Sequence, residues 1–125
     1  MGIVITDFIL TASAAGTASA SSDYEVFGEV MRIQLKAAML KNNATIKGYE
    51  TNGFNAVGSR NDFLAAVGAG SALSKEVLPQ ILSTDITGAN LTGCWQHPVV
   101  GGKLTFALAG ANEGEIVYGR VFVRN

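Results

Sequence analysis

The chain has 125 residues, which suit one domain with its own hydrophobic core and leave no room for two. Hydrophobic residues make up 48% of it and charged residues only 15%, with nine basic against ten acidic side chains. A nucleic-acid or anionic-membrane binder usually presents a basic face, and no Lys/Arg cluster occurs here, so the sequence argues against both functions. The low charge is typical of a surface covered by other protein, or simply of a Gly-, Ala-, Ser- and Thr-rich β-protein.

Met1 and Gly2 lead directly into an apolar segment, without the basic stretch and small-residue cleavage site of a signal peptide. No apolar run approaches the roughly 20 residues of a membrane-spanning helix. We therefore expect a soluble protein made in the cytoplasm. Cys94 is the single cysteine, which rules out an intrachain disulfide, and we expect it to be buried as a small apolar residue.

The first elements are extended. Residues 3–10 (IVITDFIL) are rich in β-branched and aromatic side chains, which predicts a strand. Residues 11–22 (TASAAGTASASS) are suited either to a flexible hinge or to a turn followed by a short edge strand. We favour the turn, because long structureless loops are uncommon in small domains. Residues 26–36 alternate between apolar and polar side chains, which predicts a strand with Met31, Ile33 and Leu35 on one face.

The middle of the chain is less regular. Residues 37–41 suit a helical turn that ends at the following asparagines, and residues 43–50 predict a strand closed by a turn at Thr51-Asn52-Gly53. Residues 61–67 suit a short helix or a strand equally well. Residues 74–83 open like a helix, but the interior Pro79 favours an extended edge segment. Residues 85–93 have the composition of a loop.

The last third again predicts strands. Gly101-Gly102 suits a turn, and residues 103–109 follow as a strand with Leu104, Phe106 and Leu108 on one face. Asn112-Glu113-Gly114 supplies a hairpin loop, and residues 115–124 return with Val117, Val121 and Val123 on one face. Short strands, glycine-rich turns and little helix predict one all-β domain over residues 1–125, an antiparallel β-sandwich or a jelly-roll-like barrel.

Catalytic and metal-binding patterns are weak. His97 is the single histidine, no G-x-S-x-G motif accompanies it, and the following Pro98 suggests a turn or packing role. One histidine and one cysteine cannot complete a four-ligand zinc site. Gly68-Ala69-Gly70 lacks the third glycine of a dinucleotide-binding loop. We therefore expect a protein with no enzymatic activity, no catalytic residue, no cofactor, no metal and no small-molecule substrate.

Trp95 has two interpretations. It follows Cys94 and precedes a proline turn, which places it either in the core or at the tip of a loop. We favour the core, whereas an exposed tryptophan would provide a contact for a partner protein or a sugar.

The two ends of the chain resemble small structural proteins encoded among the head genes of tailed phages. The similarity covers about the first 50 and the last 30 residues and includes no catalytic signature. It lies in a Gly-Thr-Ala segment, a glycine-initiated strand, a strand that begins with Pro-Val and continues with Gly and Leu, and a valine-rich last strand: Gly16-Thr17-Ala18, Gly28-Glu29-Val30-Met31-Arg32-Ile33, Pro98-Val99-Val100-Gly101-Gly102-Lys103-Leu104 and Val117-Tyr118-Gly119-Arg120-Val121-Phe122-Val123.

The resemblance implies a β-sandwich of the head-decoration or cement type, located in the virion, with the major capsid protein and further copies of itself as partners. Because sheet edges and terminal strands pair readily with other chains, residues 1–10 are a candidate attachment strand and residues 11–22 its hinge. The residues expected to contact partners are Ile3, Val4, Ile5, Phe8 and Trp95. The alternative function is a carbohydrate- or receptor-binding module of a tail or head fibre.

Overall fold

The structure is a computed structural model that describes residues 2–51, 62–84 and 86–125. These residues confirm the all-β prediction, since they form strands and no helix, and so no helix long and apolar enough to cross a membrane. The strands are β1 (Ile3–Thr11), β2 (Ala18–Ser21), β3 (Val26–Leu40), β4 (Thr45–Thr51), β5 (Asp62–Val67), β6 (Ser71–Val77), β7 (Ile81–Thr84), β8 (Asn90–Gln96), β9 (Val99–Ala109) and β10 (Ile116–Arg124).

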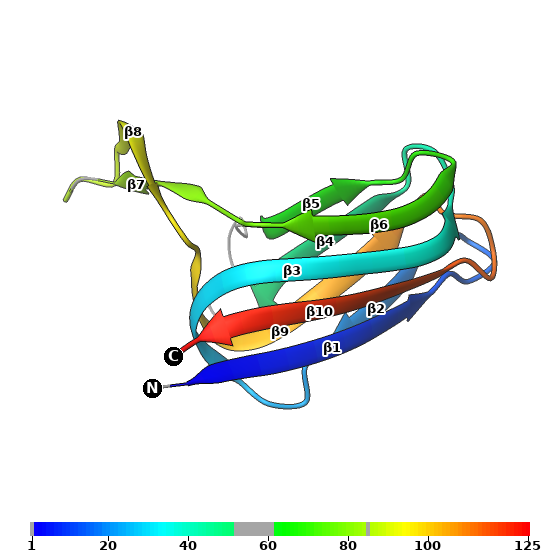
Figure 1. Cartoon of the computed structure of the whole chain (residues 1–125), viewed down its shortest axis with the longest axis horizontal. Coiled ribbons are helices and arrows are strands. Elements are labelled where there is room, and N and C mark those ends of the chain that lie inside the picture. Colours follow the sequence, from blue (N-terminus) through cyan, green and yellow to red (C-terminus); the bar gives the residue numbers. More distant parts are fainter. Residues whose placement is uncertain (1, 52–61, 85) are drawn as a thin grey trace.

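Eight of these strands form two antiparallel layers that face each other (Figure 1). The front layer has the order β1-β10-β3-β6, and the back layer has the order β2-β9-β4-β5. The layers are continuous at one end, where the start of β3 pairs with the start of β9. This is the β-sandwich-like arrangement that the strand pattern predicted. The turn and short edge strand favoured for residues 11–22 are also present, as the turn before β2 and β2 itself.

Strand β3 departs from the simple alternation of its sequence. The pairing with β10 shifts by one residue between Phe122 and Val123, so that Met31 is an extra residue on the β3 side. Such a bulge reverses the direction of the side chains that follow it. Val30 and Ile33 are therefore both buried, whereas Met31, predicted to share a face with Ile33, is half-buried. The helical turn expected at residues 37–41 is wrong, because β3 continues to Leu40.

The other strands test the remaining sequence predictions. The inward residues predicted for β9 and β10 are confirmed, since Leu104, Phe106, Leu108, Val117, Val121 and Val123 are all buried. Gly101 and Gly102 do not form the predicted turn but lie within β9, paired with Phe27 and Val26 of β3. The loop expected at residues 85–93 is also wrong in part, because β8 begins at Asn90. The turn predicted at Thr51-Asn52-Gly53 lies mainly outside the described residues.

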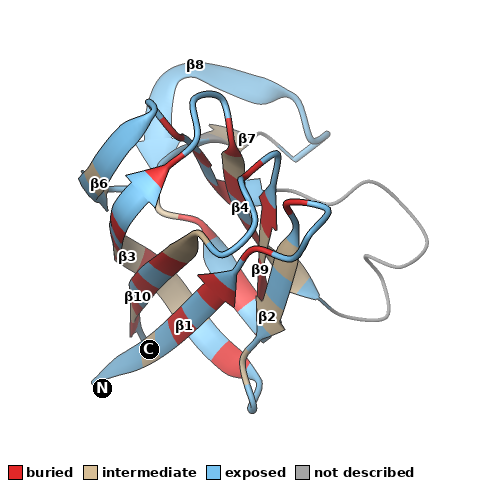
Figure 2. Ribbon diagram, turned by 90° about the vertical axis from the view of Figure 1, so that its right-hand side faces the viewer, coloured by how far each residue is buried: buried red, intermediate tan, exposed pale blue. Residues whose placement is uncertain are grey.

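The core between the layers is centred on stacked aromatic rings. Phe8 of β1 lies parallel to Phe106 of β9, with ring centroids 3.8 Å apart, and Phe63 of β5 meets Phe106 edge-on at 5.9 Å. Two glycines make room for this stack: a side chain at Gly119 would overlap the Phe8 ring, and one at Gly48 would lie 3.1 Å from Phe106. Buried residues accordingly line the interior between the layers (Figure 2).

Candidate interaction site

Strands β7 and β8 form a separate two-stranded sheet, which we call the arm. The arm projects from one end of the sandwich, beyond the point where β6 ends (Figure 1). Every residue of β8 is exposed. A two-stranded hairpin without other support is marginally stable in water, so an arm of this kind is a feature that gains from contact with another surface.

The base of the arm is tied to the sandwich. Pro79 and Pro98, which flank its two strands, are buried. The Nδ1 atom of His97 lies 3.1 Å from the carbonyl oxygen of Pro79, and the amide of Val30 donates a hydrogen bond of 2.8 Å to the carbonyl of Pro98. His97 therefore lies between β8 and β9 and joins the two ends of the arm, in agreement with the packing role expected for it.

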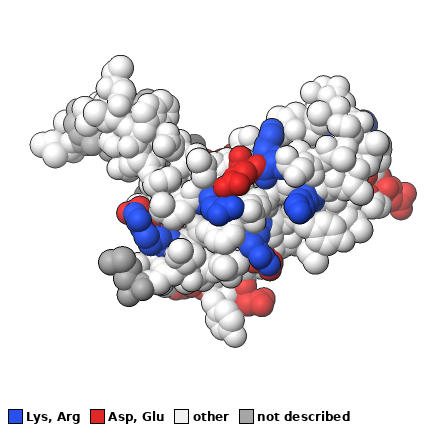
Figure 3. Space-filling model, in the orientation of Figure 1, with Lys and Arg blue, Asp and Glu red and all other residues white. Residues whose placement is uncertain are grey.

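The arm is nearly uncharged and exposes several large apolar side chains. Between Glu76 and Lys103 the sequence contains one charged residue, Asp85. Figure 3 accordingly shows no blue or red atoms on the visible face of the arm. Exposed large apolar residues occur on the arm and at its base: Leu78, Ile81, Ile86, Leu91 and Trp95. This concentration of apolar side chains is the type of surface that marks a protein interaction site.

Two sequence expectations for the arm are corrected. Trp95 was expected in the core, but it lies on β8 with 59% of its surface exposed. Cys94, expected to be buried, is exposed and unpaired. Both predictions assumed that an apolar segment packs against the body of the domain, whereas β8 pairs with β7 alone.

The other candidate contact residues lie on β1, at the edge of the front layer. Ile3, Val4 and Ile5 are exposed, as a contact surface requires. Phe8 is 6% exposed and stacks on Phe106, which removes it from any surface that a partner can reach. β1 also pairs with β10 along its whole length, so the attachment strand inferred for residues 1–10 is an integral strand of the front layer.

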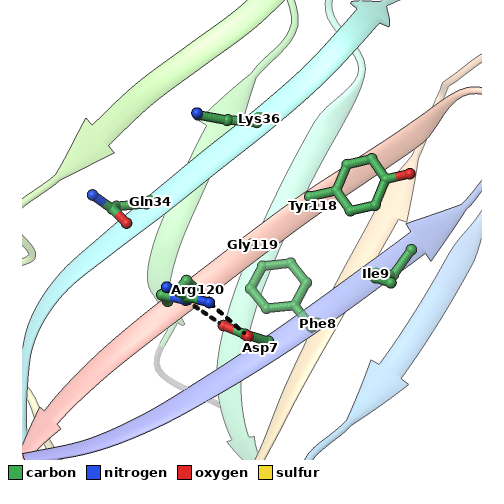
Figure 4. Close-up of a pocket in the computed structure, with 8 residues that line it drawn as sticks. All are labelled: Asp7, Phe8, Ile9, Gln34, Lys36, Tyr118, Gly119 and Arg120. Carbon is green, nitrogen blue, oxygen red and sulfur yellow. Dashed lines mark hydrogen bonds and ion pairs between the residues drawn. The ribbon is translucent and has the colours of Figure 1, made fainter.

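The outer face of the front layer has a depression of about 350 Å³ between β1, β10 and β3 (Figure 4). Its lining combines the apolar groups of Ile9 and Tyr118 with Gln34 and Lys36. On one side Arg120 donates two hydrogen bonds to Asp7, from Nε at 2.7 Å and from Nη2 at 3.0 Å. The hollow is open to solvent, and its lining includes no Ser, Thr, Cys or His side chain.

The Asp7–Arg120 pair predicts a small acid sensitivity. The hydrogen bond from Arg120 lowers the pKa of Asp7 below its ordinary value of 3.8. A depressed carboxyl pKa stabilises the folded state above that ordinary value, and the stabilisation is lost as the pH falls through the lowered pKa. We expect Asp7→Asn to lower the thermal unfolding midpoint slightly at pH 7, because both side chains are half-exposed and screened by solvent. The difference from wild type should shrink as the pH falls below 3.8 and Asp7 becomes protonated in both the folded and the unfolded state.

Thermal melts from pH 2 to pH 7 measure this effect, with Glu113→Gln in an exposed hairpin loop as the control. A constant difference between wild type and Asp7→Asn over that range would contradict the assignment to the ion pair.

The described residues include no cluster of three or more His, Cys, Asp or Glu side chains placed to hold a metal ion. Comparison with known proteins adds no family, since no family model matches the chain and no curated protein matches it either. The arm is therefore the feature of the described structure with the clearest capacity to bind another molecule.

Proposed function

We propose that the chain is a non-enzymatic structural protein of a tailed-phage virion, which decorates or stabilises the capsid through protein–protein contacts made by the arm. The observation that carries the proposal is the projecting hairpin, which is nearly uncharged and exposes several large apolar side chains. The virion of a tailed phage is proposed because both ends of the sequence resemble phage head proteins. The low overall charge also fits a surface that other protein covers.

The geometry suits attachment to a repeating surface. A rigid sandwich with a tethered arm offers a small contact per copy, and small contacts suffice when many copies assemble on one lattice. The buried prolines and the His97 contact at the base limit the directions that the arm can take, which reduces the entropy lost on binding.

The competing function is a carbohydrate- or receptor-binding module, which the exposed Trp95 favours. Sugar platforms commonly use aromatic rings for stacking. Trp95 is the single aromatic residue between Phe63 and Phe106, so the arm offers one ring, and its other large apolar side chains are aliphatic. Aliphatic side chains suit a protein surface better than a glycan, and we therefore place the capsid function first.

Cosedimentation tests the proposal. Purified protein is mixed with expanded capsids of the phage that encodes it, prepared without this protein, and the copies bound at saturation are counted. We expect a number commensurate with the capsid lattice. Trp95→Ala combined with Ile86→Ala should weaken binding about 30-fold, because we expect these two apolar side chains together to contribute about 2 kcal/mol to the interface.

Tyr24→Ala is the matched control, because Tyr24 is an exposed aromatic residue outside the arm, and it should leave binding unchanged. Folded protein that fails to bind the capsids would reject the decoration function. Binding to a glycan array that is lost in Trp95→Ala would then support the carbohydrate module.

A further inference from the structure

Among the described residues, no strand pairs with the outer edge of β1. β1 pairs with β10 on one side, and no other described strand pairs with it on the opposite side. Residues 2–6 contain no charged side chain and no proline. Natural proteins usually protect a long edge with lysine, proline, a bulge or a covering segment, because its free backbone groups otherwise pair with another chain. This edge shows none of those protections within residues 2–6.

The first half of β1 is uncovered on both faces. Ile3 and Ile5 point outward and are 64% and 53% exposed. Val4 shares the inward face with the buried Phe8, yet it is 37% exposed, so the sandwich does not close over this end of the strand. The second half is different, because Phe8 and Leu10 lie in the core. The uncovered apolar surface therefore coincides with the unprotected part of the edge.

The edge is held in a fixed position. The amide of Gly2 donates to Oδ1 of Asn125, and the amide of Asn125 donates to the carbonyl of Gly2, both at 3.1 Å. At the other end of the uncovered half, Asp7 is bound by Arg120 of β10. Because both ends are fixed, a strand that adds to this edge orders little additional chain, which favours binding.

We propose that β1 pairs antiparallel with β1 of a second copy, about a two-fold axis that passes through Ile5. In this register Ile5 lies opposite Ile5, Val4 opposite Thr6, and Ile3 opposite Asp7. The pairing places apolar side chains together at the axis and joins the two front layers into one sheet of eight strands. The Asp7 charge beside Ile3 is already neutralised by Arg120 within its own copy.

Charge and space argue against two neighbouring registers. A two-fold axis perpendicular to the sheet, passing between two copies of the same residue, keeps the outer faces of both copies on the same side of the joined sheet. An axis at Asp7 would place two carboxylates directly opposite each other, which is destabilising. An axis at Thr6 would extend the pairing to Ile9, toward the turn at residues 12–17 where the chain passes from β1 to β2. The register at Ile5 avoids both, and a net charge of −1 per copy adds little repulsion.

Sedimentation of the purified protein tests the dimer, with no particle present. We expect a concentration-dependent dimer for the wild type. Ile5→Lys should weaken the dimer at least tenfold, because it places two charges at the axis. Ile9→Lys is the matched control: Ile9 lies on the same strand and face and is 58% exposed, but it lies outside the pairing. Circular dichroism establishes that both variants are folded.

Crosslinking tests the register independently. In a Cys94→Ser background, Ile5→Cys should form an intermolecular disulfide, because directly opposite residues of a hydrogen-bonded antiparallel pair have Cα atoms about 5.5 Å apart, within the range that a disulfide spans. Ile9→Cys should not, because the two copies of residue 9 would be roughly 27 Å apart. A wild type that stays monomeric at high concentration, a dimer that Ile5→Lys leaves intact, or equal crosslinking at both positions would each overturn the proposal. Capsid binding through the arm is measured separately, so the two proposals fail independently.

Discussion

Gly119→Ala is expected to destabilise the domain by about 3 kcal/mol, a large loss for a single methyl group. The Cβ atom would point into the core and overlap the Phe8 ring, which lies across Gly119 in the paired strand. Phe8 cannot move away, because its other face stacks on Phe106. The backbone at Gly119 is in ordinary strand conformation, so the loss arises from steric overlap rather than from a strained φ. Urea denaturation measures it.

Gly101→Ala is the matched control, because Gly101 also lies within a strand and its Cβ atom would meet its nearest neighbour, Phe27, at 3.5 Å. It should change the stability by less than about 0.5 kcal/mol. Adding Phe8→Leu to Gly119→Ala should recover part of the loss, since the smaller side chain leaves room for the methyl group. Additive losses in the double variant would show that the two residues do not compete for the same space.

The alternating strands could be predicted from the sequence because one buried face imposes a period of two. Leu104, Phe106 and Leu108 on β9 and the three valines on β10 follow that period, although Thr105 of β9 is buried as well. The bulge at Met31 could not be predicted in the same way. It depends on the pairing of β3 with β10, which the β3 sequence alone does not contain.

The turn predicted at Gly101-Gly102 is wrong because that prediction rests on glycine composition alone. Two adjacent glycines favour a turn when nothing else is known. In the structure they lie in β9, where a Cβ atom at Gly102 would meet the carbonyl oxygen of Thr51 at 3.1 Å. Glycine here permits a close approach of β9 to β4, and only the tertiary structure shows this need.

The arm was the least predictable part of the candidate site. Its sequence predicts an extended edge segment from the interior Pro79 and, from composition, a loop over residues 85–93. The sequence also favours a core position for Trp95, since large apolar side chains are usually buried in a domain of this size. Charge does not distinguish the two positions of Trp95. The stretch from residue 77 to residue 102 contains one charged residue, which suits either a core or a contact surface.

Deleting residues 2–10 should unfold the domain, whereas deleting the arm should not. The first deletion removes Phe8 and Leu10 from the core, and losses of about 3–5 and 2–5 kcal/mol for such side chains approach the whole stability of a typical domain. Replacing residues 81–96 by a short Gly-Ser linker between Gln80 and His97 removes β8, whose residues are all exposed, and the strand that pairs with it.

Circular dichroism and thermal melts of both deletion variants measure the contrast, and capsid cosedimentation of the arm deletion adds the functional result. We expect a cooperative melt and no capsid binding for the arm deletion, and no cooperative melt for the β1 deletion. A cooperatively folded β1 deletion that no longer binds capsids would reverse the assignment. It would make β1 a detachable attachment strand, which the sequence suggests, and the arm would lose its role as the attachment site.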